Sequence, residues 1–402
     1  MTNNVLFLGC FYPEEEIELI RKNTKGGLQN ASNLLQWDYI HGIEYNLGDS
    51  IDIMTRMSLG IYPYHYNQAY IRRHSYDRGM GKTEVVLGFW NTIPLRPMFF
   101  NYVGIKEIHR WAKNVKGEGV VIAYSYAMAP ILRSLKRHFG SIKTVLILPD
   151  LPRYTYMAND SSLFYRIRRG VDEGELKKAI PYLDLLVPIT KQMGDVIDPE
   201  KKVRKIVIEG MANCDQPMDN ISKNSEQFVV AYTGSLTKAY GLMSLLDALD
   251  HIPDQNFRLV ICGAGEAESD IIKRKEKDTR IVFKGAITPQ EARKIQENAN
   301  LLINPRSNEG DYTKYSFPSK ILQYMASGTP VLCYKLSGFA DDYDEYLMYI
   351  DKNEKLYEAI IRIMKMKPQD LVEIGKKAKE YAIKEKSVNK QTKRLLDEIA
   401  CL

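Results

Sequence analysis

The chain has 402 residues, of which 45% are hydrophobic and 26% are charged, and its formal net charge is +6. These proportions are those of an ordinary globular protein, and the length exceeds what one hydrophobic core usually organises, so two domains are expected. The five scattered cysteines, odd in number and without a CxxC pair, argue against a disulfide framework or a zinc site and favour a reducing compartment.

The opening sequence MTNNVLFLGCFYPEEE has no basic region ahead of its short apolar run, so it does not read as a secretory signal. The longest apolar-leaning stretch, residues 85–103, contains Arg96 and two prolines and is not expected to span a membrane. We therefore expect a cytoplasmic protein, with peripheral contact to the cytoplasmic (inner) membrane surface as a second alternative.

The excess of positive charge is concentrated in residues 51–150. A basic surface of this kind suits a phosphorylated substrate or anionic lipid, and a solvated face without any partner is the plain alternative. No nucleic-acid-binding motif accompanies the charge, so no nucleic acid partner is expected.

In the first half of the chain, short β-branched runs alternate with helical patterns. Strands are expected at residues 4–9, 51–56, 84–89, 119–125, 143–149, 183–189 and 203–210, and helices at 27–43, 127–139 and 161–180. Apolar runs without strict alternation are typical of parallel strands covered on both faces. Residues 1–210 are therefore expected to form a doubly wound α/β domain.

Residues 211–226 are polar and turn-rich, which predicts a linker, and the alternation then restarts. Strands are expected at 228–234, 258–263, 280–285, 299–305, 330–334 and 347–351, and helices at 241–251, 266–276, 288–298 and 318–327. This pattern predicts a second doubly wound domain over residues 227–375, with ligands beyond the carboxyl ends of its strands. A Lys-rich amphipathic helix over residues 376–402 would follow.

Two strand-to-helix turns of the second domain carry candidate ligand contacts. Gly234 and Ser235 end one strand and Lys238 follows; a small residue lets a phosphate approach the backbone, and a lysine supplies charge. Gly263 and Gly265 repeat this arrangement, but no third glycine completes GxGxxG, which disfavours a dinucleotide dehydrogenase. Ordinary α/β turns containing glycine remain the alternative.

The strongest signal is YSFPSKILQYMASG, residues 315–328. Pro318 suits a first helical turn and Ser316 can cap the helix, so free amides and the positive end of the helix dipole would suit a phosphate or diphosphate. Lys320 and Arg306 add charge near the same helix start. A purely structural helix explains the serine and the proline, but not this clustering of cations.

These segments resemble the nucleotide-binding half of the GT-B glycosyltransferases of retaining family 4, of the bacterial surface-polysaccharide type. The resemblance covers residues 228–335, through YTGSLTKAYGL, CGAGEAE, IVFKGAIT, LLINPR and YTKYSFPSKILQYMASGTPVL. The first half is similar more loosely, through KGGLQNAS, which contains Gly27, and VLILPDLPRY, which contains Asp150. The resemblance implies two Rossmann-like domains facing a central cleft, with the C-terminal helix crossing back to the N-terminal domain.

The resemblance also implies that the second domain binds a nucleotide sugar and the first binds the acceptor. The family's two glutamates align with Tyr315 and Gln323, so both acids are missing here. Gln323 can still bond to ribose hydroxyls, and Glu309 becomes the candidate near the sugar. The family's arginine position holds Ser235, which leaves Lys238 as the substitute cation.

The resulting candidates form two sets. The predicted catalytic residues are Asp150, Lys238 and Glu309. The predicted nucleotide-sugar-binding residues are Gly27, Gly234, Ser235, Gly263, Gly265, Lys284, Arg306, Tyr315, Ser316, Phe317, Lys320 and Gln323.

The implied reaction transfers a sugar from a nucleotide diphosphate sugar and retains the anomeric configuration. A UDP-sugar is the favoured donor. The implied acceptor is a glycan or an undecaprenyl-diphosphate-linked glycan of capsule or exopolysaccharide synthesis. The amides of Ser316 and Phe317, the helix dipole and Lys238 would stabilise the departing diphosphate, so no metal or other cofactor is expected. The one DxD match, Asp342 to Asp344, lies away from these turns.

The acceptor side is less defined. Residues 62–78 mix tyrosines with arginines and could meet a lipid-linked sugar at the membrane surface, or form a flexible loop without a ligand. Two rival functions stay open: a catalytically silent GT-B subunit, which the missing glutamates favour, and another GT-B enzyme, such as a sugar-nucleotide epimerase or a phosphorylase.

Overall fold

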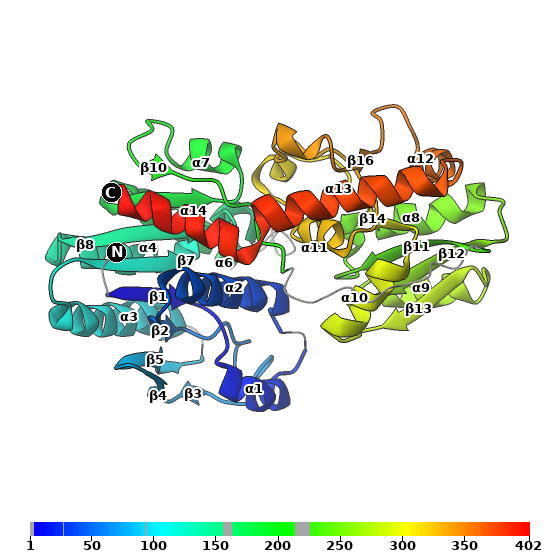
Figure 1. The fold of residues 1–402 in the computed structure, drawn as a ribbon. Helices are drawn as coiled ribbons and strands as arrows, with labels where there is room; N and C mark the ends of the chain where they lie inside the picture. Colours follow the sequence, from blue (N-terminus) through cyan, green and yellow to red (C-terminus); the bar gives the residue numbers. More distant parts are fainter. Residues whose placement is uncertain (1–3, 27, 93–94, 156–162, 214–225) are drawn as a thin grey trace. The chain divides into compact units, whose positions relative to one another are not determined.

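The computed structural model describes residues 4–26, 28–92, 95–155, 163–213 and 226–402 (Figure 1). The chain forms two compact units, unit 1 with residues 1–209 and 388–402, and unit 2 with residues 210–387. The expected boundaries were 210, 226 and 375, and most of the expected linker, residues 214–225, lies outside the described residues. None of the helices in the described ranges is long and apolar enough to cross a bilayer.

Unit 1 is built on an eight-stranded sheet in the order β10-β9-β8-β7-β1-β2-β5-β4. The strands are β1 (Val5–Gly9), β2 (Asp52–Thr55), β4 (His74–Gly79), β5 (Lys82–Val86), β7 (Gly119–Tyr124), β8 (Ile142–Leu148), β9 (Leu185–Pro188) and β10 (Arg204–Lys205). Neighbouring strands are parallel except for β4, which pairs antiparallel with β5. The order reverses at β1, which lies between β2 and β7.

The sequence patterns located the parallel strands of unit 1 but not its antiparallel pairs. Besides β4, a short pair joins β3 (Tyr70–Ile71) to β6 (Phe89–Trp90). Residues 62–78 are therefore not a loop throughout, because residues 70–71 belong to β3 and residues 74–78 to β4. These segments have mixed polar composition, since β4 alternates between intermediate and exposed side chains.

Helices cover the sheet of unit 1, and the last one comes from the end of the chain. They are α1 (Ile17–Asn23), α2 (Asn30–Leu47), α3 (Leu95–Asn114), α4 (Ala129–His138), α5 (Pro152–Thr155), α6 (Leu163–Ala179), α7 (Lys191–Ile197) and α14 (Val388–Ala400). The Asn46 side-chain amide of α2 donates to the Asn389 carbonyl and to Thr392 Oγ1 of α14, both at 2.9 Å. The C-terminal helix thus returns to the first unit.

Unit 2 has a six-stranded, fully parallel sheet in the order β13-β12-β11-β14-β15-β16. Its strands are β11 (Phe228–Thr233), β12 (Phe257–Cys262), β13 (Ile281–Gly285), β14 (Leu301–Asn304), β15 (Val331–Cys333) and β16 (Met348–Tyr349). Its helices are α8 (Leu242–Ala248), α9 (Glu268–Lys275), α10 (Pro289–Asn298), α11 (Lys320–Ser327), α12 (Leu356–Met364) and α13 (Pro368–Lys386). The residues expected as one helix over 376–402 are thus divided between α13 and α14.

Apolar cores lie on both faces of this sheet. One core includes Leu245 of α8, Ile271 of α9 and Ile360 of α12. The other includes Leu322 of α11 and Ala378 of α13. The strand order reverses between β11 and β14, and in doubly wound sheets the ligand crevice lies beyond the carboxyl ends of the strands at such a switch point.

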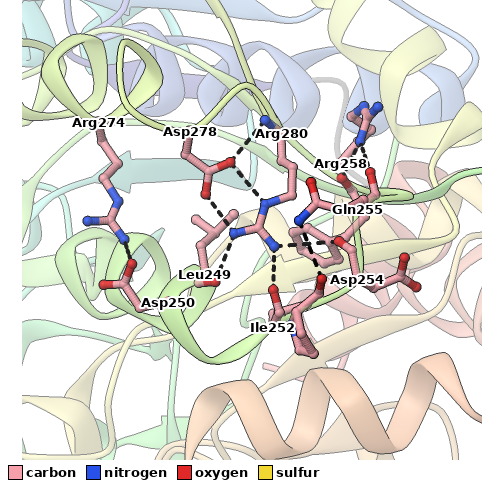
Figure 2. A network of polar contacts seen from close by, with 11 residues as sticks. Leu249, Asp250, Ile252, Asp254, Gln255, Arg258, Arg274, Asp278 and Arg280 are labelled. Atoms are coloured by element: carbon pink, nitrogen blue, oxygen red, sulfur yellow. Dashed lines mark hydrogen bonds and ion pairs between the residues drawn. The ribbon is translucent and has the colours of Figure 1, made fainter.

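Arg280 ties together the loops at the opposite, amino-terminal edge of this sheet (Figure 2). Its guanidinium donates to both carboxylate oxygens of Asp278, at 2.9 and 2.7 Å, and to the carbonyls of Leu249 and Ile252. The side chains of Arg280 and Asp278 are only 11% and 15% exposed. The hydrogen bond from Arg280 lowers the pKa of the Asp278 carboxyl.

We expect Arg280→Met to lower the free energy of unfolding of unit 2 by about 2 kcal/mol, because it leaves the mostly buried Asp278 carboxylate without its cation and the Ile252 carbonyl without its guanidinium donor. The Asp278 pKa is lower in the folded state, so its contribution is present above the unfolded-state value of about 4 and is lost as the pH falls through the folded-state value. The difference between wild type and variant, measured by urea denaturation, should be constant from neutral pH to about pH 5 and shrink in acid. A difference that does not depend on pH would contradict the role of the Arg280–Asp278 pair.

Candidate functional site

The glycine turns of unit 2 pack against each other where β11 and β12 end. Gly263 has φ +142°, and a Cβ at this position would lie 1.8 Å from the carbonyl oxygen of Gly234. The two turns are hydrogen-bonded, since the Leu236 amide donates to the Ala264 carbonyl at 3.0 Å. Packing of one turn on the other is therefore a sufficient reason for glycine at position 263, and a ligand is not needed to explain it.

A second close approach joins the turn after β11 to the loop after β14. Gly241 has φ +79°, and a Cβ there would lie 2.0 Å from the carbonyl oxygen of Pro305. The preceding 3₁₀ turn, Lys238–Tyr240, is thereby held against the residue that follows Pro305. This packing explains how Tyr240 comes to lie beside Arg306.

Arg306 is the central side chain of the site. Its guanidinium carbon lies 5.1 Å from the ring centroid of Tyr240 and 5.0 Å from that of Tyr312. Its Nη2 donates to Ser316 Oγ at 3.0 Å. Within the described part of the chain its Nε is buried without an acceptor, and no carboxylate lies at ion-pair distance from it. Arg306 is thus a positioned cation whose charge no carboxylate of the described residues neutralises.

Ser316 does not cap the following helix, which corrects the sequence-based prediction. Its backbone is extended, and its hydroxyl donates to the Tyr312 carbonyl at 3.2 Å while accepting from Arg306. The helix α11 begins two residues after Pro318, and its N-cap residue, Ser319, makes no side-chain capping bond. The preference of serine for N-caps was overridden here by the arginine, whose partner could not be read from local sequence.

The amides expected to face a diphosphate precede α11. Among the hydrogen bonds of the described residues, neither the Ser316 nor the Phe317 amide is a donor. The Phe317 side chain, in contrast, is a core residue, with its ring centroid 5.1 Å from that of Phe339. The candidate contribution of Phe317 is therefore its backbone N–H.

Helix α11 is fixed to the end of β11 by a buried hydroxyl. The Tyr324 hydroxyl accepts from the Thr233 amide at 2.9 Å and donates to the Thr233 carbonyl at 3.1 Å. Gln296 of α10 donates to Thr233 Oγ1 at 2.7 Å. These contacts hold the start of the Gly234 turn and α11 in one rigid arrangement, and the sequence analysis did not identify them.

Lys320 and Gln323 lie one turn apart on α11 and contact each other. Lys320 Nζ donates to Gln323 Oε1 at 2.9 Å, and burial lowers the pKa of the ammonium. Gln323 is exposed. Because the partner is an amide rather than a carboxylate, the charge of Lys320 is not neutralised by this contact.

Lys238, the predicted substitute cation, faces α9 instead. Its Nζ lies 2.7 Å from Asp270 Oδ2, and its amide donates to Glu266 Oε1 at 2.8 Å. The hydrogen bond to Asp270 raises the pKa of Lys238. In this arrangement most of the lysine charge is balanced, so Arg306 and Lys320 are the better-placed cations.

The remaining predicted residues are dispersed. Gly234 and Ser235 follow β11 directly, with Ser235 Oγ 2.8 Å from Thr237 Oγ1, and Gly265 lies in the turn after β12. Tyr315 ends the 3₁₀ turn Asp311–Tyr315, and Glu309 is exposed on the loop before it. Lys284 is exposed on the edge strand β13, separated from β14 by β12 and β11.

Two further predicted residues come from the part of the chain that belongs to unit 1. Asp150 is exposed beyond the carboxyl end of β8 in unit 1, where it acts electrostatically on Tyr124. Gly27 lies outside the described residues. The carboxylates of the DxD match contact lysines: Asp344 pairs with Lys335, and Asp342 Oδ2 lies 3.5 Å from Lys386 Nζ.

One family model matches part of the chain. Residues 227–366 match the family model described as "Glycosyl transferases group 1". This match covers the sheet of unit 2 and the whole candidate site, and it indicates a glycosyltransferase. No curated protein sequence matches the chain.

Solved glycosyltransferase structures match along the full chain. They include sucrose-phosphate synthase from Thermosynechococcus elongatus, with TM-score 0.69 and 14% identity over 99% of this chain and 100% of that one. A UDP-forming α,α-trehalose-phosphate synthase from Burkholderia vietnamiensis has TM-score 0.68 and 10% identity, over 100% and 97%. The lipopolysaccharide outer core galactosyltransferase WaaB has TM-score 0.63 and 12% identity, over 99% of both chains. The chain has the GT-B fold, which confirms the predicted fold class.

Proposed function

We propose that the protein is a retaining glycosyltransferase that moves a sugar from a UDP-sugar to a glycan or an undecaprenyl-diphosphate-linked glycan in capsule or exopolysaccharide synthesis. The observation that carries the proposal is Arg306, a cation that pairs with no carboxylate of the described ranges and that follows β14, where the strand order of unit 2 reverses. A dianionic diphosphate is the ligand that such an edge, with an arginine and free amides, is suited to bind.

The proposed catalysis stabilises the negative charge of the leaving group. As the bond between the sugar and the diphosphate breaks, negative charge grows on the departing phosphate oxygen. Arg306, Lys320 and the amides of Ser316 and Phe317 would stabilise that charge, and because their positions are fixed beforehand, little reorganisation is needed. The role of these groups is electrostatic and positional, and no protein nucleophile is assigned.

The solved structures named above share only the fold with this chain, so they support a uridine nucleotide and a surface-polysaccharide role by analogy. One of them is described as UDP-forming, and another acts on lipopolysaccharide outer core. The resemblance of residues 228–335 to the surface-polysaccharide branch of the family points the same way. The acceptor is assigned to unit 1 on the same grounds, with peripheral membrane contact as part of the proposal.

Calorimetric titration with a panel of UDP-, GDP- and dTDP-sugars tests the proposal. We expect one UDP-sugar to bind, and its nucleoside diphosphate to be released when a lipid-linked acceptor is added. Donor binding without any turnover across acceptors would favour the catalytically silent subunit, which the absence of glutamate at Tyr315 and Gln323 supports. Absence of binding by every sugar nucleotide would overturn the proposal.

Gln323→Ala should weaken donor binding by about 1–2 kcal/mol, because an exposed amide one turn into α11 would lose its bonds to the ribose hydroxyls. The measurement is the donor dissociation constant by calorimetry. Gln290→Ala, at an exposed glutamine of α10, is the matched control and should leave the constant unchanged. Equal donor dissociation constants for Gln323→Ala and Gln290→Ala would contradict a contact between Gln323 and the ribose.

A further inference from the structure

Helix α6 of unit 1 carries a row of exposed aliphatic side chains, which we call the α6 stripe. Its members, Leu163, Ile167 and Val171, are 67%, 60% and 54% exposed, and their spacing of four residues places them along one face of the helix. Gly170 and Gly174 share this face, and a Cβ at either position would meet no atom within 4 Å. A single exposed aliphatic side chain is ordinary, but three in one row indicate a surface that binds a partner.

The stripe is not needed to hold α6 on unit 1. The side chain of Leu176 is buried on another face of the helix. Glu175 Oε2 lies 2.9 Å from Arg133 Nη2 of α4, and Glu173 Oε1 lies 3.3 Å from Arg153 Nε of α5. These contacts fix α6 through its inward face and its borders, so the α6 stripe remains available.

The charge left over on α6 is positive. Its third carboxylate, Asp172, also has a cation partner, because its Oδ2 accepts from Arg168 Nε at 3.0 Å. Arg166 and Lys177 are exposed, and no ion pair among the described residues involves either of them. The helical repeat of 3.6 residues places both cations beside the α6 stripe.

We propose that the α6 stripe attaches unit 1 to an anionic membrane surface, with its aliphatic side chains at the level of the lipid headgroups and with Arg166 and Lys177 against the lipid phosphates. Such a surface suits this helix, since long basic side chains can reach the phosphates while the apolar ones leave water. The inference rests on the proposed function in one respect, because a lipid-linked acceptor would lie in the same membrane.

A second copy of the chain fits this face less well. In a twofold-symmetric contact through the α6 stripe, Arg166 and Lys177 of one copy would approach the same residues of the other, and like charges repel. Anionic lipids neutralise these cations instead. The charge beside the stripe therefore favours a membrane as the occupant.

The test is co-sedimentation of the full chain with vesicles of phosphatidylglycerol and phosphatidylethanolamine at low salt. We expect Val171→Asn to lower the vesicle partition constant by about tenfold, because a polar amide replaces an apolar side chain that leaves water on binding. Val372→Asn is the matched control, since Val372 is 57% exposed on α13 of unit 2, and it should partition like the wild type. Near-UV circular dichroism checks that both variants are folded.

Two further variants separate the electrostatic and the apolar contributions. Arg166→Gln combined with Lys177→Gln should weaken binding to the anionic vesicles by about tenfold and leave binding to phosphatidylcholine vesicles unchanged. In Ile167→Trp, the fluorescence of the new tryptophan should shift to shorter wavelength when anionic vesicles are added, because the ring leaves water. The wild type, with its three native tryptophans, supplies the background for this measurement.

Equal partition constants for Val171→Asn and Val372→Asn would overturn the proposal, as would an absence of binding to anionic vesicles at low salt. A dimer that Val171→Asn dissociates without a change in vesicle binding would assign the stripe to a second copy and also overturn it. Donor binding is measured without vesicles. Sugar-nucleotide binding without vesicle binding therefore contradicts this inference alone, whereas vesicle binding without sugar-nucleotide binding contradicts the proposed function alone.

Discussion

Replacing Arg306 by glutamine should weaken binding of the nucleotide-sugar donor by about ten- to hundredfold, since hydrogen bonds to charged groups contribute about 1.5–3 kcal/mol. The guanidinium is already positioned by Tyr240, Tyr312 and Ser316, so little side-chain entropy is lost when a diphosphate binds. Because no described carboxylate neutralises it, its full charge is available to the ligand.

Calorimetry with the preferred donor measures the effect. Arg306→Lys should recover part of the affinity, because it keeps the charge but loses the fork that can hold two phosphate oxygens. Arg258→Gln is the control, since Arg258 lies on β12 and donates to carbonyls of the 255–257 segment, at the amino-terminal edge of the same sheet. Donor affinity that falls equally in the control and in Arg306→Gln would argue against a direct contact.

Replacing Gly263 by alanine should lower the free energy of unfolding of unit 2 by about 3 kcal/mol or more. The new Cβ would lie 1.8 Å from the Gly234 carbonyl oxygen, and φ +142° is unfavourable for any residue with a side chain. One of the two turns would have to move, which would break the hydrogen bond between Leu236 and Ala264 and displace the strand end that precedes Ser235.

Gly285→Ala is the matched control, because Gly285 also has positive φ, +67°, but a Cβ there meets nothing within 4 Å. It should cost only about 1 kcal/mol, the price of the backbone conformation alone. Far-UV circular dichroism in urea reports both units, whereas the three tryptophans, Trp37, Trp90 and Trp111, all lie in unit 1. Similar losses in the two variants would mean that the turns do not pack as described.

Central parallel strands such as β1, β7 and β9 could be predicted from sequence because they are buried on both faces and appear as short apolar runs. β4 and β6 could not, since β4 has only intermediate and exposed side chains, β6 is two residues long, and their pairing partners set their conformation. The break between α13 and α14 was missed for a similar reason. Both helices are amphipathic, and nothing in the local pattern marks Ser387, whose backbone is extended.

In the site, the cations were predicted but their partners were not. Clustering of charge near residues 306–320 pointed to Arg306, whereas the rings of Tyr240 and Tyr312 reach it only through the close approach of two loops. Lys238 was weighed as a free cation because Asp270 is far from it in sequence. Sequence reasoning finds residues that can bind a phosphate, but only tertiary contacts decide which of them are already neutralised.

Unit 1 is formed by two separate stretches of the chain, residues 1–209 and 388–402, and this affects the order in which the units are completed during synthesis. Its last helix, α14, buries Leu395, Leu396 and Ile399, and it is synthesised only after all of unit 2. Unit 2 is continuous in sequence, whereas unit 1 keeps the face of α2 that receives α14 uncovered until α14 has emerged from the ribosome. During synthesis, the first unit of the polypeptide is therefore the last to be completed.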